Sequence, residues 1–120
     1  MKRTELVEKI AKSIDAKDAD LFSEFITEDG IFHFGNAEPV KGRENIRQYV
    51  AGFFTMIKNS THKILDLWDD GKSMIWKGEV TYTRLDDKKV TVKFVNVFNM
   101  KNDMITDYLI YIDNTPLFAD

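Results

Sequence analysis

The sequence has no cysteine among its 120 residues, which excludes disulfide bonds, thiolate catalysis and thiolate-bound metals. It contains only two histidines, His33 and His62, and they stand too far apart in the chain to suggest a histidine-rich metal site. We therefore expect neither a metal nor a cofactor.

Long apolar runs are also missing. No stretch approaches the ~18 apolar residues of a membrane-spanning helix. The segment Met1–Lys9 carries acids and basic residues where a signal peptide needs an apolar run. The net charge is −3, and no basic stripe of the kind that binds nucleic acid is present. These absences predict a cytoplasmic protein with no membrane or nucleic-acid partner.

The composition that remains is that of an ordinary globular protein, with 43% hydrophobic and 31% charged residues. A chain of this length can bury a real hydrophobic core in one domain. We therefore predict a single domain over residues 1–120.

Helical periodicity dominates the first half of the chain. Thr4 is a suitable N-cap for a helix that ends near residues 15–17, and Asp18 is suited to cap a second, short helix that stops at residues 28–30. The clearest pattern predicts a third helix over residues 43–58. Its apolar positions recur without exception at helical spacing: Ile46, Tyr49, Val50, Phe53, Phe54 and Ile57.

Strands are expected in the remaining parts of the chain. Residues 31–34 predict a short strand, and residues 35–42 have the composition of a loop. From residue 62 onward the apolar pattern has a period of two, which predicts four strands over residues 62–68, 73–84, 90–100 and 104–113. Short turns make these four strands antiparallel neighbours, so the sequence predicts an α+β domain with helices grouped on one face of a sheet.

The strand expected over residues 90–100 is apolar on both of its faces. One face carries Val92, Phe94, Asn96 and Phe98, so Asn96 is a primary amide between aromatic rings. A buried amide without hydrogen-bond partners costs about 1–3 kcal/mol. Its partner is expected to be protein, water or a ligand.

Four stretches of the chain resemble the family of nuclear transport factor 2, ketosteroid isomerase and the SnoaL-like polyketide cyclases. They are residues 15–22, 39–46, 94–98 and 111–118, and the last looks most like SnoaL-like proteins. The resemblance implies a curved antiparallel or mixed sheet wrapped around three N-terminal helices, a cone-shaped, cystatin-like α+β roll with a deep pocket. It also implies a homodimer through the outer face of the sheet.

The resemblance places two polar residues at the reactive positions of ketosteroid isomerases. His33 falls where those enzymes carry their general base, and Asn96 falls where they carry an oxyanion-hole acid. Their first-helix tyrosine has no counterpart here, since that region holds Ile10 and Ile14. His33 is therefore a candidate acid/base, or a core histidine hydrogen-bonded to the backbone. Asn96 is a candidate carbonyl donor, or a structural amide.

Alternation along the strands and the third helix predicts an apolar ligand site. Asp66 is open to two interpretations, a charge at a strand edge or a pocket carboxylate that pairs with His33. The expected lining consists of Phe53, Phe54, Trp76, Tyr82, Phe94, Phe98, Tyr108, Ile110 and Ile112.

Three functions stay open at this point. The first is an isomerase, cyclase or dehydratase, similar to steroid delta-isomerases or polyketide cyclases, that moves a proton on a small apolar carbonyl compound. The second is a non-catalytic binding module for an apolar metabolite. The third is a dimerisation or adaptor domain. The apolar second face of the long strands, with Val95, Val97, Leu109 and Tyr111, predicts the homodimer, and the apolar tail Pro116–Phe118 is expected to dock on the domain.

Overall fold

The computed structural model describes residues 2–119 and divides them into four helices and six strands. In chain order these are α1 (Arg3–Asp15), α2 (Ala19–Ser23), β1 (Ile26–Phe34), β2 (Val40–Lys41), α3 (Arg43–Phe54), β3 (Ile57–Asp69), β4 (Ser73–Arg84), β5 (Lys89–Lys101), β6 (Met104–Ile112) and α4 (Thr115–Phe118).

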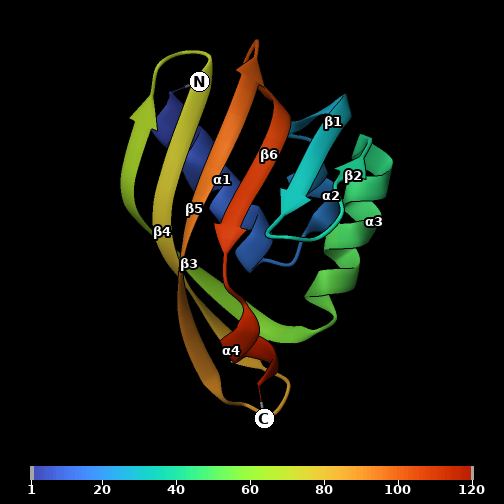
Figure 1. Cartoon of the computed structure of the whole chain (residues 1–120), viewed down its shortest axis with the longest axis vertical. Helices are drawn as coiled ribbons and strands as arrows, with labels where there is room; N and C mark the ends of the chain where they lie inside the picture. Colours follow the sequence, from blue (N-terminus) through green and yellow to red (C-terminus); the bar gives the residue numbers. More distant parts are fainter. Residues whose placement is uncertain (1, 120) are drawn as a thin grey trace.

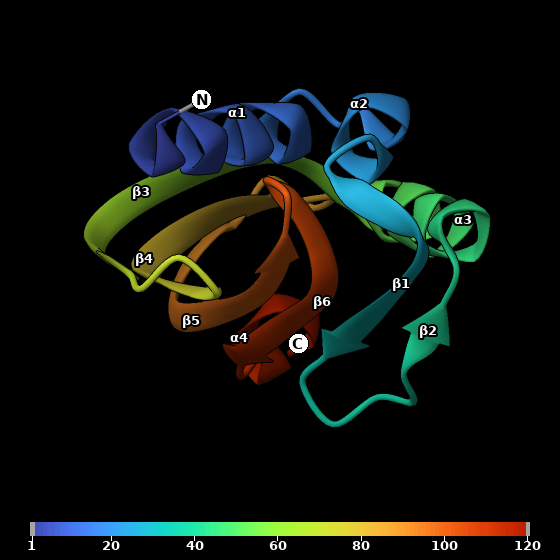
Figure 2. The ribbon, with the colours of Figure 1, turned by 90° about the horizontal axis from the view of Figure 1, so that it is seen from above.

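The six strands form one open, mixed sheet in the order β2-β1-β6-β5-β4-β3 (Figure 1). Strands β3 to β6 are antiparallel neighbours, as the short turns predict, and only β1 pairs in parallel, with β6. The sheet curls, and α1, α2 and α3 lie along its concave side (Figure 2). This arrangement confirms the predicted α+β fold.

The boundary between α3 and β3 differs from the prediction. The helix ends at Phe54, where the amides of Thr55 and Met56 switch to carbonyls three residues back, and β3 begins at Ile57 rather than at residue 62. Ile57 keeps the helical spacing and is buried, but it is buried as the first residue of a strand. Periodicity alone could not separate these two ways of burying one β-branched side chain.

The start of β1 also differs from the prediction. Phe25 and Ile26 were expected in the second helix, which ends at Ser23 instead, and Ile26 pairs with Ile105 of β6. Residues 28–30, expected as a helix stop, lie inside β1, where the register with β6 shifts between Ile26 and Ile31. Such a shift accommodates polar residues and a glycine in a strand that is otherwise apolar. Strand β2 lies in the segment expected as a loop.

The C-terminal tail is held by one of its two large apolar side chains. Leu117 is 3% exposed, whereas Phe118 is 58% exposed. The guanidinium of Arg84 at the end of β4 donates a hydrogen bond to the carbonyl of Ala119, which fixes the end of α4 against the sheet. No helix among residues 2–119 has the length and apolar character needed to cross a membrane.

Gly78 in the middle of β4 allows two strands and two rings to approach closely. A β-carbon built there would lie 2.4 Å from the carbonyl oxygen of Lys63 on β3 and 2.8 Å from the Phe94 ring. The register of β3 against β4 shifts at this point, between Ile64 and Asp66. The missing side chain leaves space in which the rings of Trp76 and Phe94 pack with centroids 5.1 Å apart.

Replacing Gly78 with alanine is expected to destabilise the protein by about 1–3 kcal/mol, because the new methyl group would force β3 away from β4. Gly52→Ala is the matched control: Gly52 lies on the exposed side of α3 with no atom near its absent β-carbon. Alanine there should stabilise the helix by about 0.5–1 kcal/mol. Urea unfolding of both variants measures the contrast. Equal stability of Gly78→Ala and the wild type would show that the strands have more room than the structure indicates.

Candidate functional site

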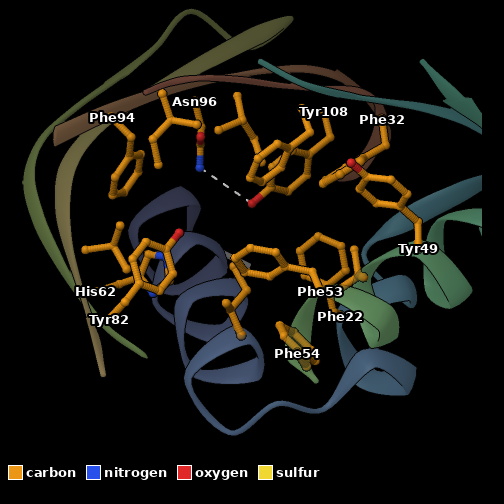
Figure 3. Close-up of a pocket in the computed structure, with 16 residues that line it drawn as sticks. Phe22, Phe32, Tyr49, Phe53, Phe54, His62, Tyr82, Phe94, Asn96 and Tyr108 are labelled. Carbon is orange, nitrogen blue, oxygen red and sulfur yellow. Dashed lines mark hydrogen bonds between the residues drawn. The ribbon is translucent and has the colours of Figure 1, made fainter. Parts of the chain in front are cut away.

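A cavity of about 60 Å³ lies between the concave face of the sheet and the helices (Figure 3). Its walls are mostly aromatic and aliphatic. The lining residues are Ile14, Phe22, Phe32, Phe34, Tyr49, Val50, Phe53, Phe54, His62, Val80, Tyr82, Phe94, Asn96, Tyr108, Ile110 and Ile112.

Most of the side chains expected to form a ligand site lie in this wall. Trp76 and Phe98 do not, because both are fully buried behind it. Phe98 packs against the ring of Tyr108 with centroids 4.5 Å apart, so it supports the wall without reaching the cavity. The expected residues found in the wall are Phe53, Phe54, Tyr82, Phe94, Tyr108, Ile110 and Ile112, together with Asn96.

The structure does not bring His33 and Asn96 to one cavity. Phe32 and Phe34 line the cavity, and strand alternation therefore turns His33 to the outer face of the sheet, opposite Leu109 of β6. Nor does Asp66 approach His33. Asp66 is exposed opposite Lys77, on the strand farthest in the sheet from β1 and β2, which makes it a surface charge.

The histidine that does line the cavity is His62 on β3, which the sequence did not single out. Its side chain is 9% exposed, and its ring packs against those of Trp76 and Phe94. The ring nitrogen Nδ1 lies 2.5 Å from Oδ1 of Asp15 at the end of α1. Since a carboxylate only accepts hydrogen bonds, this contact places a hydrogen on Nδ1, so Nε2 is the nitrogen that a neutral form of the ring leaves free to accept a proton.

Asp15 is held by three groups of β3. Besides His62 Nδ1, the hydroxyl of Ser60 donates to Oδ1 at 2.9 Å and the backbone amide of His62 donates to Oδ2 at 2.9 Å. Lys17, which leaves the helix with a positive φ, donates to the carbonyls of Ile57 and Lys58 and joins the same helix end to β3.

The ionisation of Asp15 is the net result of opposing effects. Partial burial raises its pKa, but the hydrogen bond and the charge of His62, with the hydrogen bond from Ser60, outweigh burial and leave the pKa of Asp15 below its usual 3.8. The carboxylate also stands at the negative end of the α1 dipole, which disfavours it. A carboxylate kept at this unfavourable helix end therefore depends on its contacts with β3.

Three further polar tips point into the cavity. In Figure 3 the hydroxyls of Tyr82 and Tyr108 and the amide nitrogen of Asn96 are directed to the same space. Asn96 Nδ2 lies 3.5 Å from Tyr108 Oη, the distance of a weak hydrogen bond. Burial raises the pKa of Tyr82 to about 12 and places that of Tyr108 well above its usual range, so both phenols keep their hydrogens at neutral pH.

The buried oxygen of Asn96 and the indole nitrogen of Trp76 have no hydrogen-bond partner among residues 2–119. The two residues stand opposite each other on β5 and β4. An unpaired buried polar group costs about 1–3 kcal/mol. The amide is therefore an expensive residue for this position, where an apolar side chain would pack without that cost.

One signal in the sequence could have indicated the pair of Asp15 and His62. An aspartate in the last turn of a predicted helix opposes the helix dipole, and Ser60 and His62 stand two residues apart, as one face of a strand requires. The sequence does not show that this helix end and this strand start lie side by side.

A family model for the SnoaL-like domain matches residues 7–108, most of the chain. The chain belongs to the SnoaL-like domain family. A search of curated proteins found no significant match.

Solved structures with the same fold are distant in sequence from this SnoaL-like chain. They include a protein of unknown function from Burkholderia pseudomallei described as nuclear transport factor 2-like (TM-score 0.84, 13% identity, covering 95% of this chain and 92% of that one). A protein from Catenulispora acidiphila with a ketosteroid isomerase-like fold, in complex with trimethylamine, gives a TM-score of 0.82 at 17% identity. The match covers 89% of this chain and 84% of that one. An LEH-like epoxide hydrolase of M. tuberculosis gives a TM-score of 0.78 at 16% sequence identity, and the match covers 95% of this chain and 84% of that one. At these identities the likeness establishes the fold alone.

The bonds to Asp15 predict a specific acid sensitivity. Because the pKa of Asp15 is lower in the folded chain than in the unfolded one, the stability from its ionised form is full above about pH 4 and is lost as the pH falls below that value. Asp15→Asn should therefore lower the free energy of unfolding at neutral pH. On acidification, that free energy should fall less in the variant than in the wild type. Urea unfolding between about pH 6 and pH 2 tests this. Asp66→Asn, an exposed change on the same strand as His62, is the control; a parallel pH curve for Asp15→Asn and the wild type would contradict the prediction.

Proposed function

We propose that this SnoaL-like protein is an enzyme that moves a proton on a small apolar carbonyl compound, as an isomerase, cyclase or dehydratase, with His62 as its acid/base. One observation carries the proposal: a histidine oriented by a carboxylate at Nδ1 lines the same cavity as Asn96 and Tyr108. A base within reach of substrate and held by a third group is the usual arrangement for general acid–base catalysis.

The proposed step transfers a proton from the carbon beside the carbonyl to Nε2 of His62. The electron pair of the broken C–H bond becomes the double bond of an enolate, and the negative charge moves to the carbonyl oxygen. Tyr108 donates its hydroxyl hydrogen to that oxygen, while Asn96 donates to Tyr108. Ionised Asp15 stabilises the imidazolium, which then returns its proton to the substrate at another carbon or to a leaving oxygen.

The apolar wall contributes to this chemistry. The rings of Phe94 and Trp76 flank His62, and the cavity that it lines has a mostly apolar wall. Electrostatic interactions are several times stronger in such a low-dielectric space than in water. A hydrogen bond to a developing oxyanion therefore stabilises the transition state more than it would at the surface.

A binding module for a small amine is the second candidate. The aromatic wall offers ring faces to a cation, and Nε2 of His62 could accept a hydrogen bond from an ammonium group. The related structure from Catenulispora acidiphila contains trimethylamine, which supports this alternative. Titration with trimethylamine, followed by NMR, distinguishes the two: tight amine binding without proton exchange on carbonyl compounds would favour the module.

The two histidines provide the test of the enzymatic proposal. Deuterium exchange beside the carbonyl of cyclopentanone, followed by NMR in D₂O, should fall about 10²–10⁴-fold in His62→Gln, because general base catalysis contributes that much. His33→Gln changes the other histidine, on the outer face of the sheet, and should leave the exchange rate unchanged. Equal exchange in the wild type and His62→Gln would refute the assignment.

We also propose that two copies of the chain pair through the outer face of the sheet. That face exposes large apolar side chains, with Trp68 52% and Tyr111 60% exposed, and contiguous apolar patches often mark interaction sites. Its apolar members come from five neighbouring strands: Ile31, Trp68, Ile75, Val95, Val97, Leu109 and Tyr111.

Val97→Arg, near the centre of this face, should convert the protein to a monomer, because the interface would bury an unpaired charge. Light scattering at micromolar concentration measures the mass. Met56→Arg places the same charge beyond the end of α3, away from the sheet face, and should leave the mass unchanged. A monomeric mass for the wild type would refute the dimer.

A further inference from the structure

We propose that the ligand is a compact monofunctional ketone or aldehyde, bound through the hydroxyls of Tyr82 and Tyr108, and that polycyclic ligands are excluded. The inference rests on the proposed function for its carbonyl chemistry and adds the size of the ligand and the role of Tyr82.

The size follows from the volume of the cavity. The cavity measures about 60 Å³. Pockets for drug-sized ligands typically measure ~300–1,000 Å³. The aromatic side chains of this chain occupy the space that a larger ligand would need.

The wall is braced by contacts between rings from different elements. The centroid of the Tyr108 ring on β6 lies 5.3 Å from the ring centroid of Phe22 on α2 and 5.2 Å from that of Phe32 on β1. On the helix side, the ring of Phe53 on α3 packs against those of Phe34 and Tyr82, with centroids 5.7 Å and 5.9 Å apart. Well-packed rings resist displacement, so a larger ligand would have to separate several elements at once.

Phe53 is the residue whose replacement should change the size limit on the ligand. It is only half-buried, unlike Phe22, Phe32 and Tyr108, and it spans the gap between β1 and β4 through its contacts with Phe34 and Tyr82. Shortening Phe53 should enlarge the cavity while most of the core remains intact.

The two phenols define the polar end of the ligand. Tyr108 accepts a hydrogen bond from Asn96, and no acceptor for its own hydroxyl hydrogen is found among residues 2–119. The hydroxyl of Tyr82, on the inner face of β4, points to the same space (Figure 3). Two donors and an apolar surround fit one carbonyl oxygen on an otherwise apolar body.

Ligand binding followed by NMR of the ¹⁵N-labelled protein tests the size limit. The ligands are cyclopentanone, a compact ketone with one ring, and decalone, a bicyclic ketone that is roughly twice as large. If the pocket adapted freely, decalone would bind more tightly, because each buried methylene favours binding. We expect instead that decalone binds the wild type at least about tenfold more weakly than cyclopentanone, and that Phe53→Ala reverses the order. Phe53→Leu serves if the alanine variant is unstable.

Three tyrosine variants test the polar end. Tyr82→Phe and Tyr108→Phe should each weaken cyclopentanone binding about three- to tenfold, the loss of one hydrogen bond. Tyr111→Phe makes the same change on the exposed outer face and should have no effect. Tighter binding of decalone than cyclopentanone by the wild type would overturn the size limit, and unchanged affinity in both pocket variants would overturn the role of the phenols.

The outcomes separate this inference from the proposed function. If cyclopentanone binds as expected but His62 catalyses no deuterium exchange, the ligand class stands and the catalytic proposal fails. If exchange depends on His62 and decalone exchanges and binds better than cyclopentanone, the catalytic proposal stands and the size limit fails.

Discussion

The carboxylate of Asp15 joins the helical layer to the sheet, and the candidate site depends on that joint. It stands at the unfavourable end of the α1 dipole and is kept ionised by Ser60 and by the ring and backbone of His62. The same bonds fix the orientation of the imidazole that lines the cavity. Lys17 strengthens the joint by binding the first carbonyls of β3. Stability and the orientation of the candidate base are therefore supplied by one cluster, so a change at Asp15 affects both.

The fold could be predicted because most of its elements satisfy a local rule. Period-two runs after residue 62, separated by short turns, determine the antiparallel order of β3 to β6. Predictions failed where one side chain satisfies two rules. Ile57 fits both the end of α3 and the start of β3, and Ile26 fits both a second helix and β1. Those ambiguities are resolved by pairing between strands distant in sequence, which local patterns do not contain.

The candidate site was predictable in its apolar part and not in its polar part. Alternation places Phe94, Asn96 and Tyr108 on the inner face of the sheet, where the cavity lies. The same alternation places His33 outside, since its neighbours Phe32 and Phe34 line the cavity. The positional match with ketosteroid isomerases favoured His33, but a strand reverses its facing side with every residue, so a match within one residue does not establish which face is used. The pair of His62 and Asp15 required knowledge that the end of α1 meets the start of β3.

The aromatic residues of this chain have two roles that limit each other. Rings from α2, α3, β1, β4, β5 and β6 bury apolar surface against one another, which stabilises the packing of the helices on the concave face of the open sheet. Every ring added for stability also reduces the cavity. Asn96 runs against this tendency, because its buried oxygen is unpaired where an apolar side chain would cost less. This amide lines the same cavity as two phenols and the oriented imidazole, which is the arrangement on which the proposed function rests. The distant solved structures share this fold, and a fold alone does not determine a ligand, so it is the rings and polar groups lining this cavity that support a ligand here.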